Sequence, residues 1–180
     1  MASLGRASAG LAALVIVAAA LSACGGGSDS SSTSTSSSGA GSSSVAKTPY
    51  GKSLGNLCAH ADKTVNALPE FPYPTFNPYF PDTSKLPSIG RFFDHTSLPA
   101  YEAFVSKVDK VQPPPSQKQA FEAFRRDLDA YLANLKRQIS AAKASDSSTF
   151  VDTVKAFGDI ESRAHADEGA LGIPPCEGIT

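Results

Sequence analysis

The sequence lacks the features that mark most functional classes of protein. Its formal charge is −1, from 16 Lys and Arg against 17 Asp and Glu, so it has no excess of basic residues for holding nucleic acid. The apolar run at residues 11–21 is too short for a helix to span a bilayer core of about 30 Å. No P-loop, nucleophile elbow, HExxH, CxxC or GxGxxG motif is present. We therefore expect neither enzyme activity nor a cofactor.

Residues 1–23 have the composition of a lipoprotein signal peptide, because 17 of the 23 are apolar. They lead into Leu21-Ser22-Ala23-Cys24, which resembles the bacterial lipobox. The resemblance implies that Cys24 carries a diacylglyceryl group and anchors the protein to the outer face of the cell membrane, since two acyl chains hold a protein stably. The alternative is a soluble secreted protein cut at Ser22-Ala23 by ordinary signal peptidase.

Residues 24–45 make up the lipidated cysteine and a tether. Of the twenty residues from 25 to 44, eighteen are Gly, Ser or Thr, a composition that cannot bury enough apolar surface to fold. A Gly/Ser chain of this length has an r.m.s. span of roughly 25 Å. We expect a disordered tether, whose Ser and Thr residues are also candidates for glycosylation.

Residues 46–180 form the predicted folded domain and contain all fifteen aromatic residues, 10 Phe and 5 Tyr. Apolar residues recur there at helical spacing in four segments, without a β alternation of useful length. The predicted helices cover residues 51–68, residues from 97 to the prolines at 113–115, residues from 116 to about 142, and residues 147–171. Seven of the 13 prolines lie in residues 69–99, which predicts an extended crossover. The fold class is therefore all-α, a four-helix bundle with a long Pro/aromatic-rich crossover between helices 1 and 2.

Helix ends are indicated by capping residues. Ser116 with Gln119 has the S-x-x-Q form of a capping box, and Asp146 is a candidate N-cap for the last helix. Gly172 is a suitable residue just beyond the end of that helix.

The remaining cysteines, Cys58 and Cys176, form a pair in an oxidising extracytoplasmic compartment. We expect a disulfide between them; the alternative is two free thiols. In the chain-entropy model, closing a loop of about 100 residues contributes up to about 4.7 kcal/mol.

Several of these features occur together in a known group of proteins. The Pro-rich crossover, the prolines at 113–115 and the terminal ALGIPPC sequence resemble those of small actinobacterial secreted or lipid-anchored helical proteins. The shared motifs are structural, so the resemblance implies an extracytoplasmic helical domain and assigns no functional residue.

Glu161, His165 and Glu168 form the first of two candidate sites. At about 100° per residue the three side chains fall within roughly 60° of one helix face. Carboxylate and imidazole ligands at this spacing occur in helix-bundle metal centres. The alternative is an ordinary solvated flank paired with Arg163 or Lys155.

Aromatic residues of the crossover form the second candidate site. Exposed rings framed by prolines can anchor a binding partner at little entropic cost, and they can equally cover a groove of the bundle. The residues concerned are Tyr73, Phe76, Tyr79 and Phe80.

These observations predict a lipid-anchored cell-envelope protein that acts as a non-enzymatic binding or scaffold module. Its expected partners are the membrane, through Cys24, and an envelope protein or the cell wall. The alternative is an extracytoplasmic lipoprotein that binds a metal or another small ligand.

Overall fold

The computed structural model describes residues 48–174 and residue 176. The predicted signal peptide, Cys24 and the predicted tether lie outside the described residues. Within them all regular structure is helical, without a strand, and this confirms the all-α prediction. The α-helices are α3 (Pro49–Asn66), α4 (Leu86–His95), α5 (Ser97–Val108), α6 (Lys118–Lys143) and α7 (Ser147–Leu171), with a short 3-10 helix, η2 (Pro115–Gln117).

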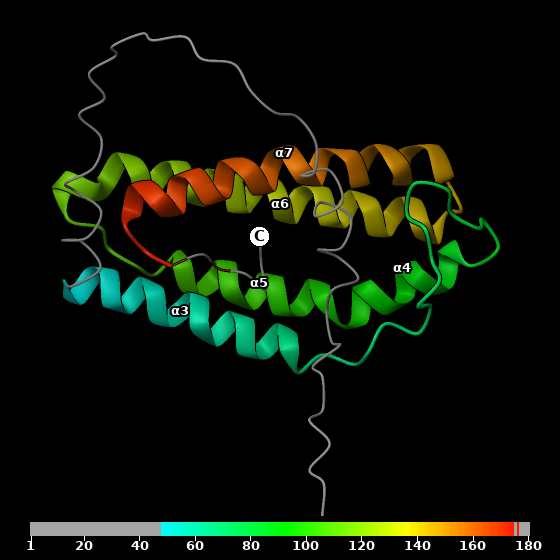
Figure 1. Ribbon diagram of the computed structural model, residues 1–180, viewed down its shortest axis with the longest axis horizontal. Helices are drawn as coiled ribbons and strands as arrows, with labels where there is room; N and C mark the ends of the chain where they lie inside the picture. Colours follow the sequence, from blue (N-terminus) through cyan, green and yellow to red (C-terminus); the bar gives the residue numbers. More distant parts are fainter. Residues whose placement is uncertain (1–47, 175, 177–180) are drawn as a thin grey trace, which may run out of the picture.

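The helices lie side by side along the long axis of the molecule (Figure 1). α6 and α7 form a closely packed pair, and α3 packs against α5 on the other side of the core. α4 and α5 follow one another with a break at Thr96, and both contact α6. The loop 67–85 wraps the end of the molecule opposite the start of α3. Over the described residues, none of the helices combines the length and apolar character needed to cross a membrane.

α4 corrects the predicted crossover, which extends only to Lys85 and not to residue 99. The prolines of residues 69–99 suggested an extended chain, but Pro87 lies in the first turn of α4, where a missing N–H costs nothing. The helix buries Leu86, Ile89 and Phe93, which follow the i, i+3, i+7 spacing of a helical stripe.

The capping predictions have different outcomes. Asp146 does cap α7, because its carboxylate accepts a hydrogen bond of 3.0 Å from the Thr149 N–H. Gly172 ends α7 in the left-handed conformation at φ 64°, as predicted. The capping box at Ser116 is wrong: η2 precedes α6, and the N-cap residue Gln117 makes no side-chain capping bond.

The larger of two buried clusters in the core includes the fully buried Leu54, Val108 and Phe124. At Gly90 the helices α4 and α6 approach closely, because a Cβ atom there would lie 2.9 Å from the backbone nitrogen of Lys143. A glycine is therefore required for this helix crossing.

Candidate functional site

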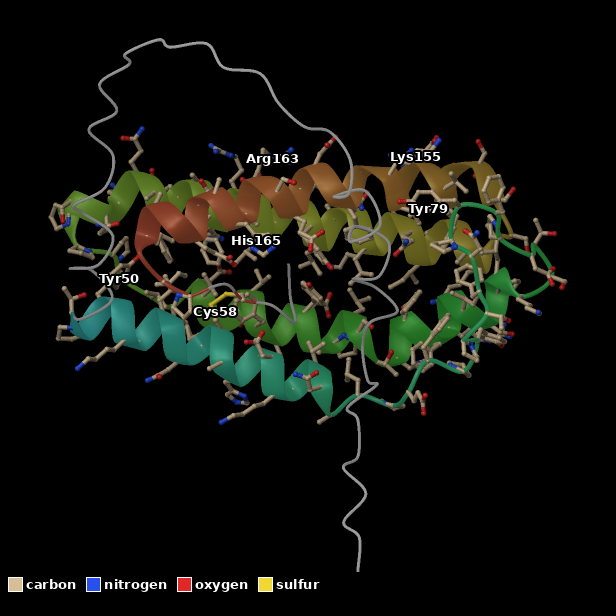
Figure 2. The ribbon with its side chains drawn as sticks, in the orientation of Figure 1. Tyr50, Cys58, Tyr79, Lys155, Arg163 and His165 are labelled. Atoms are coloured by element: carbon tan, nitrogen blue, oxygen red, sulfur yellow. A yellow bond between two sulfur atoms is a disulfide. The ribbon has the colours of Figure 1, made fainter. Side chains whose placement is uncertain are left out.

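A disulfide ties the C-terminal segment to α3. Cys58 and Cys176 are both buried, their Cα atoms lie 4.7 Å apart, and their side chains are bonded (Figure 2). The predicted pairing is confirmed. Beyond α7 the chain turns back in a Schellman arrangement, in which the Ile173 N–H donates to the Glu168 carbonyl over 3.2 Å.

The predicted trio on α7 comes together around His165. His165 Nδ1 lies 2.9 Å from Glu168 Oε2, and its Nε2 lies 3.9 Å from Glu161 Oε1. The three side chains differ in exposure: the Glu168 side chain is 2% exposed, that of Glu161 22% and that of His165 40%. Figure 2 shows His165 between α7 and the lower layer, in the neighbourhood of Cys58. The trio therefore runs from the buried disulfide region to the surface.

Glu168 has two polar neighbours, the His165 ring and the Cys176 N–H, which donates to Glu168 Oε1 over 3.2 Å. Nowhere in residues 48–174 or at residue 176 are three His, Cys, Asp or Glu side chains grouped so as to hold one metal ion. Arg163 does not pair with the trio, because its guanidinium donates to Asp127 of α6 over 3.1 Å.

A stack of aromatic rings lies beneath this region. Tyr101 and Tyr131 stack with their ring centroids 4.6 Å apart, and Phe157 packs on Tyr131 at 4.7 Å. The Tyr101 hydroxyl is buried against the Tyr131 phenol. Burial raises the pKa of Tyr101 well above its usual range, and the nearby phenol of Tyr131 and carboxylate of Glu161 raise it further. The phenol is therefore held neutral.

A small pocket of about 40 Å³ lies between α3 and α5. Its lining is mostly apolar and includes Leu57, Val65 and Phe104. Such a volume has room for water but not for an organic ligand of ordinary size.

The four aromatic residues proposed as a surface divide into two pairs. Phe76 packs edge-on against Phe150 of α7 with ring centroids 6.0 Å apart, and Tyr73 packs against Phe71 at 5.6 Å. Both are partly buried against the core. Tyr73 and Phe76 therefore cover the bundle, in agreement with the alternative interpretation of the crossover.

Tyr79 and Phe80 are exposed, by 38% and 83%. Their backbone is fixed by Asn77, whose side-chain oxygen accepts from the Tyr79 N–H over 3.0 Å and whose carbonyl accepts from the Phe80 N–H over 3.2 Å. A second turn follows, in which the Asp82 carboxylate accepts from Ser84. We call Tyr79 and Phe80 the aromatic tip.

Sequence reasoning missed a carboxylate pair between α6 and α7. Asp127 is 6% exposed and carries the ion pair with Arg163, and one carboxylate oxygen of Asp167 is buried beside Asp127. Burial, and next the neighbouring Asp127 carboxylate, raise the pKa of Asp167 to about 6. Only the packing of α7 on α6 brings the two residues together, so no local pattern in the sequence reveals the pair.

Comparison of the chain with protein-family models, curated proteins and solved structures finds no match.

Proposed function

We propose that the protein is a lipid-anchored cell-envelope protein, attached through Cys24, that binds an envelope partner without enzymatic chemistry. In this proposal the domain acts as one four-helix bundle, with α4 and α5 serving as a single broken helix, and the aromatic tip makes the contact. The observation that carries the proposal is the 83% exposure of Phe80 on a loop with a fixed backbone.

The free energy that a partner can gain at the tip comes from the apolar area that Phe80 and Tyr79 leave in water. Burying a phenylalanine side chain contributes about 1.5–3 kcal/mol, which is roughly 10- to 150-fold in affinity. A partner that covers Phe80 loses little of this gain to ordering the loop, because the Asn77 turn already fixes the backbone. Tyr79 adds a second ring with a polar end, a residue type enriched at binding hot spots.

The position of the tip favours a partner away from the membrane. The tip belongs to the loop at the end of the molecule opposite Thr48, where the chain enters α3 (Figure 1). α6 alone, with 26 residues, is about 39 Å long. The chain enters the domain at Thr48, so in this proposal the tip lies at the end farther from the anchor. An envelope protein or a cell-wall polymer is therefore the expected partner.

Co-sedimentation of an anchor-free C24S variant with purified cell-wall material tests the binding surface. We expect the variant to sediment with the wall, and the added Phe80→Ser substitution to lower the bound fraction at least tenfold. Ala133→Ser, at an exposed position on α6, is the matched control and should leave binding unchanged. Equal retention of both variants, with unchanged melting temperatures, would contradict the proposal.

Mass spectrometry of the N-terminal peptide tests the anchor separately. We expect a peptide that begins at Cys24 and carries diacylglycerol. An unmodified peptide beginning at Ala23 would support the soluble secreted alternative instead.

A further inference from the structure

We propose that the end of the domain where the chain enters α3 is a docking surface for the anionic headgroups of a lipid bilayer. We call this surface the basic end and define it by the exposed side chains of Lys52, Lys107, Lys110 and Lys118. The orientation that docking gives the domain rests on the proposed anchor at Cys24, whereas the attraction to anionic lipid depends only on the described residues.

Contacts between helices bring these lysines to one end of the bundle. The ring of Tyr50, in the first turn of α3, packs on that of Phe121, in the first turn of α6, with centroids 6.3 Å apart. α5 runs antiparallel to α3, so its last turn lies beside the first half of α3 (Figure 1). Asp109, which follows α5, pairs with Arg125 of α6. The end of α5 and the starts of α3 and α6 therefore share one surface, and Figure 2 shows Tyr50 there, far from Tyr79 of the aromatic tip.

Few carboxylates compensate the lysines of the basic end. Residues 48–61, 110–121 and 169–176 contain no Asp or Glu. Three of the four lysines form no ion pair among the described residues. The fourth, Lys118, forms a loose pair of 3.8 Å with Glu122, and both side chains are more than half exposed, so this pair contributes little. The basic end is therefore positively charged.

The opposite end of the molecule lacks such an excess of cations. Lys85 pairs with Asp82 over 3.6 Å. Lys143 likewise pairs with Asp94 over 2.7 Å. The charged residues of that end are the cations Lys85, Arg91, Arg137 and Lys143 and the carboxylates Glu70, Asp82, Asp94, Asp146 and Asp152. An anionic surface therefore attracts the basic end and not the end that carries the aromatic tip.

The position of the basic end makes a weak attraction sufficient. The chain enters the domain at Thr48, so in the proposed anchored form the bilayer lies within reach of a tether whose r.m.s. span is about 25 Å. Each Lys close to an anionic membrane surface favours the contact about fivefold. Because the anchor keeps the domain at a high effective concentration near the bilayer, this attraction holds the basic end on the lipid. The aromatic tip then points away from the membrane.

Energy transfer from a single tryptophan to labelled lipid tests this surface. The chain has no Trp, so one introduced indole is the only donor. Gln112→Trp places the donor at an exposed position of the loop between α5 and η2, and Phe80→Trp places it at the aromatic tip. Each anchored protein is reconstituted into vesicles that carry a dansyl-labelled headgroup. The vesicles are made of phosphatidylcholine, with or without phosphatidylglycerol.

We expect transfer from position 112 to rise about twofold or more when phosphatidylglycerol is present, while transfer from position 80 stays low. About 1 M salt should remove the rise, because the Debye length falls to about 3 Å. Lys52→Gln combined with Lys110→Gln should also remove it, since each change weakens the contact about fivefold. Lys63→Gln combined with Lys155→Gln removes two exposed lysines outside the basic end and is the matched control, which should keep the rise.

Equal transfer from position 112 in the two kinds of vesicle would overturn the proposal, as would a rise that survives high salt or is lost equally in both double variants. The anchor and the docking surface fail separately. If Cys24 carries lipid and the transfer is equal, the anchor stands and the basic end does not dock. If the N-terminal peptide is unmodified, the soluble chain is added to the same vesicles, and the absence of transfer from position 112 in anionic vesicles would overturn the docking surface.

Discussion

Asp167→Asn should stabilise the protein at neutral pH. The pKa of Asp167 is raised from 3.8 to about 6, mainly by burial and then by Asp127. Each unit of pKa difference between the folded and unfolded states corresponds to about 1.36 kcal/mol, so the ionised carboxylate destabilises the folded state by at most roughly 3 kcal/mol. Since the side chain keeps contact with solvent, we reduce the expectation to about 1 kcal/mol.

The sign follows from proton linkage. Between pH 3.8 and about 6 the unfolded chain has released the Asp167 proton while the folded protein still holds it, so this group's contribution to stability falls as the pH rises through that window. Below it, both states are protonated and the full contribution is present. The asparagine variant does not titrate, so it should match the wild type most closely near pH 4 and exceed it above pH 6.5.

Urea unfolding followed by circular dichroism at pH 4, 5, 6.5 and 7.5 measures this difference. At a typical denaturant slope of about 2 kcal/mol/M, the midpoint of Asp167→Asn should exceed that of the wild type by roughly 0.5 M at pH 7.5. Asp152→Asn, at an exposed position on the same helix, is the control and should show no such pH-dependent gain. A variant that is less stable than the wild type at pH 7.5 would refute the reasoning.

Three further predictions concern stability and are checked by thermal or urea unfolding. Gly90→Ala should lower the free energy of unfolding by about 1–3 kcal/mol, because the added Cβ would meet the α6 backbone. Gly158→Ala should raise it by up to about 1 kcal/mol, because a Cβ there meets nothing within 4 Å. Equal effects of the two variants would contradict the close helix crossing. Cys58→Ser should lower the free energy of unfolding by up to about 4.7 kcal/mol, because it removes the disulfide. An unchanged midpoint of unfolding would show that the disulfide does not contribute to stability. Phe76→Ala should lower the free energy of unfolding by about 2 kcal/mol, less than the usual 3–5 kcal/mol for a fully buried ring, because Phe76 is only partly buried. Phe80→Ala should change it by less than about 0.5 kcal/mol, because the ring is exposed. A large loss in Phe80→Ala would mean that the tip packs against the domain.

Local patterns in the sequence were sufficient to predict most of the helices. The Asp146 cap and Gly172 both act within one or two turns of α7, so their residue types identify the helix ends. The density of prolines in residues 69–99 predicts an extended chain and conceals α4, although Leu86, Ile89 and Phe93 follow helical spacing. Proline in a first turn is compatible with a helix, and this distinction depends on position and not on composition.

The candidate sites were less predictable because they depend on contacts between elements. Helical spacing was sufficient to group Glu161 with His165, but the burial of Glu168 depends on the C-terminal segment that the disulfide holds in place. Likewise, nothing local distinguishes Phe76, which contacts Phe150, from the exposed Phe80. The raised pKa of Asp167 also arises from a neighbour on another helix.

Photocrosslinking in intact cells tests the central claim most directly. A photoreactive phenylalanine analogue replaces Phe80 in the full, anchored chain, and the same analogue at Ala59, an exposed position on α3, serves as the control. The account predicts a discrete crosslinked product at position 80 that is absent at position 59 and reduced at least tenfold by Tyr79→Ser. No product at position 80, or the same products at both positions, would contradict the assignment of the aromatic tip as the binding surface.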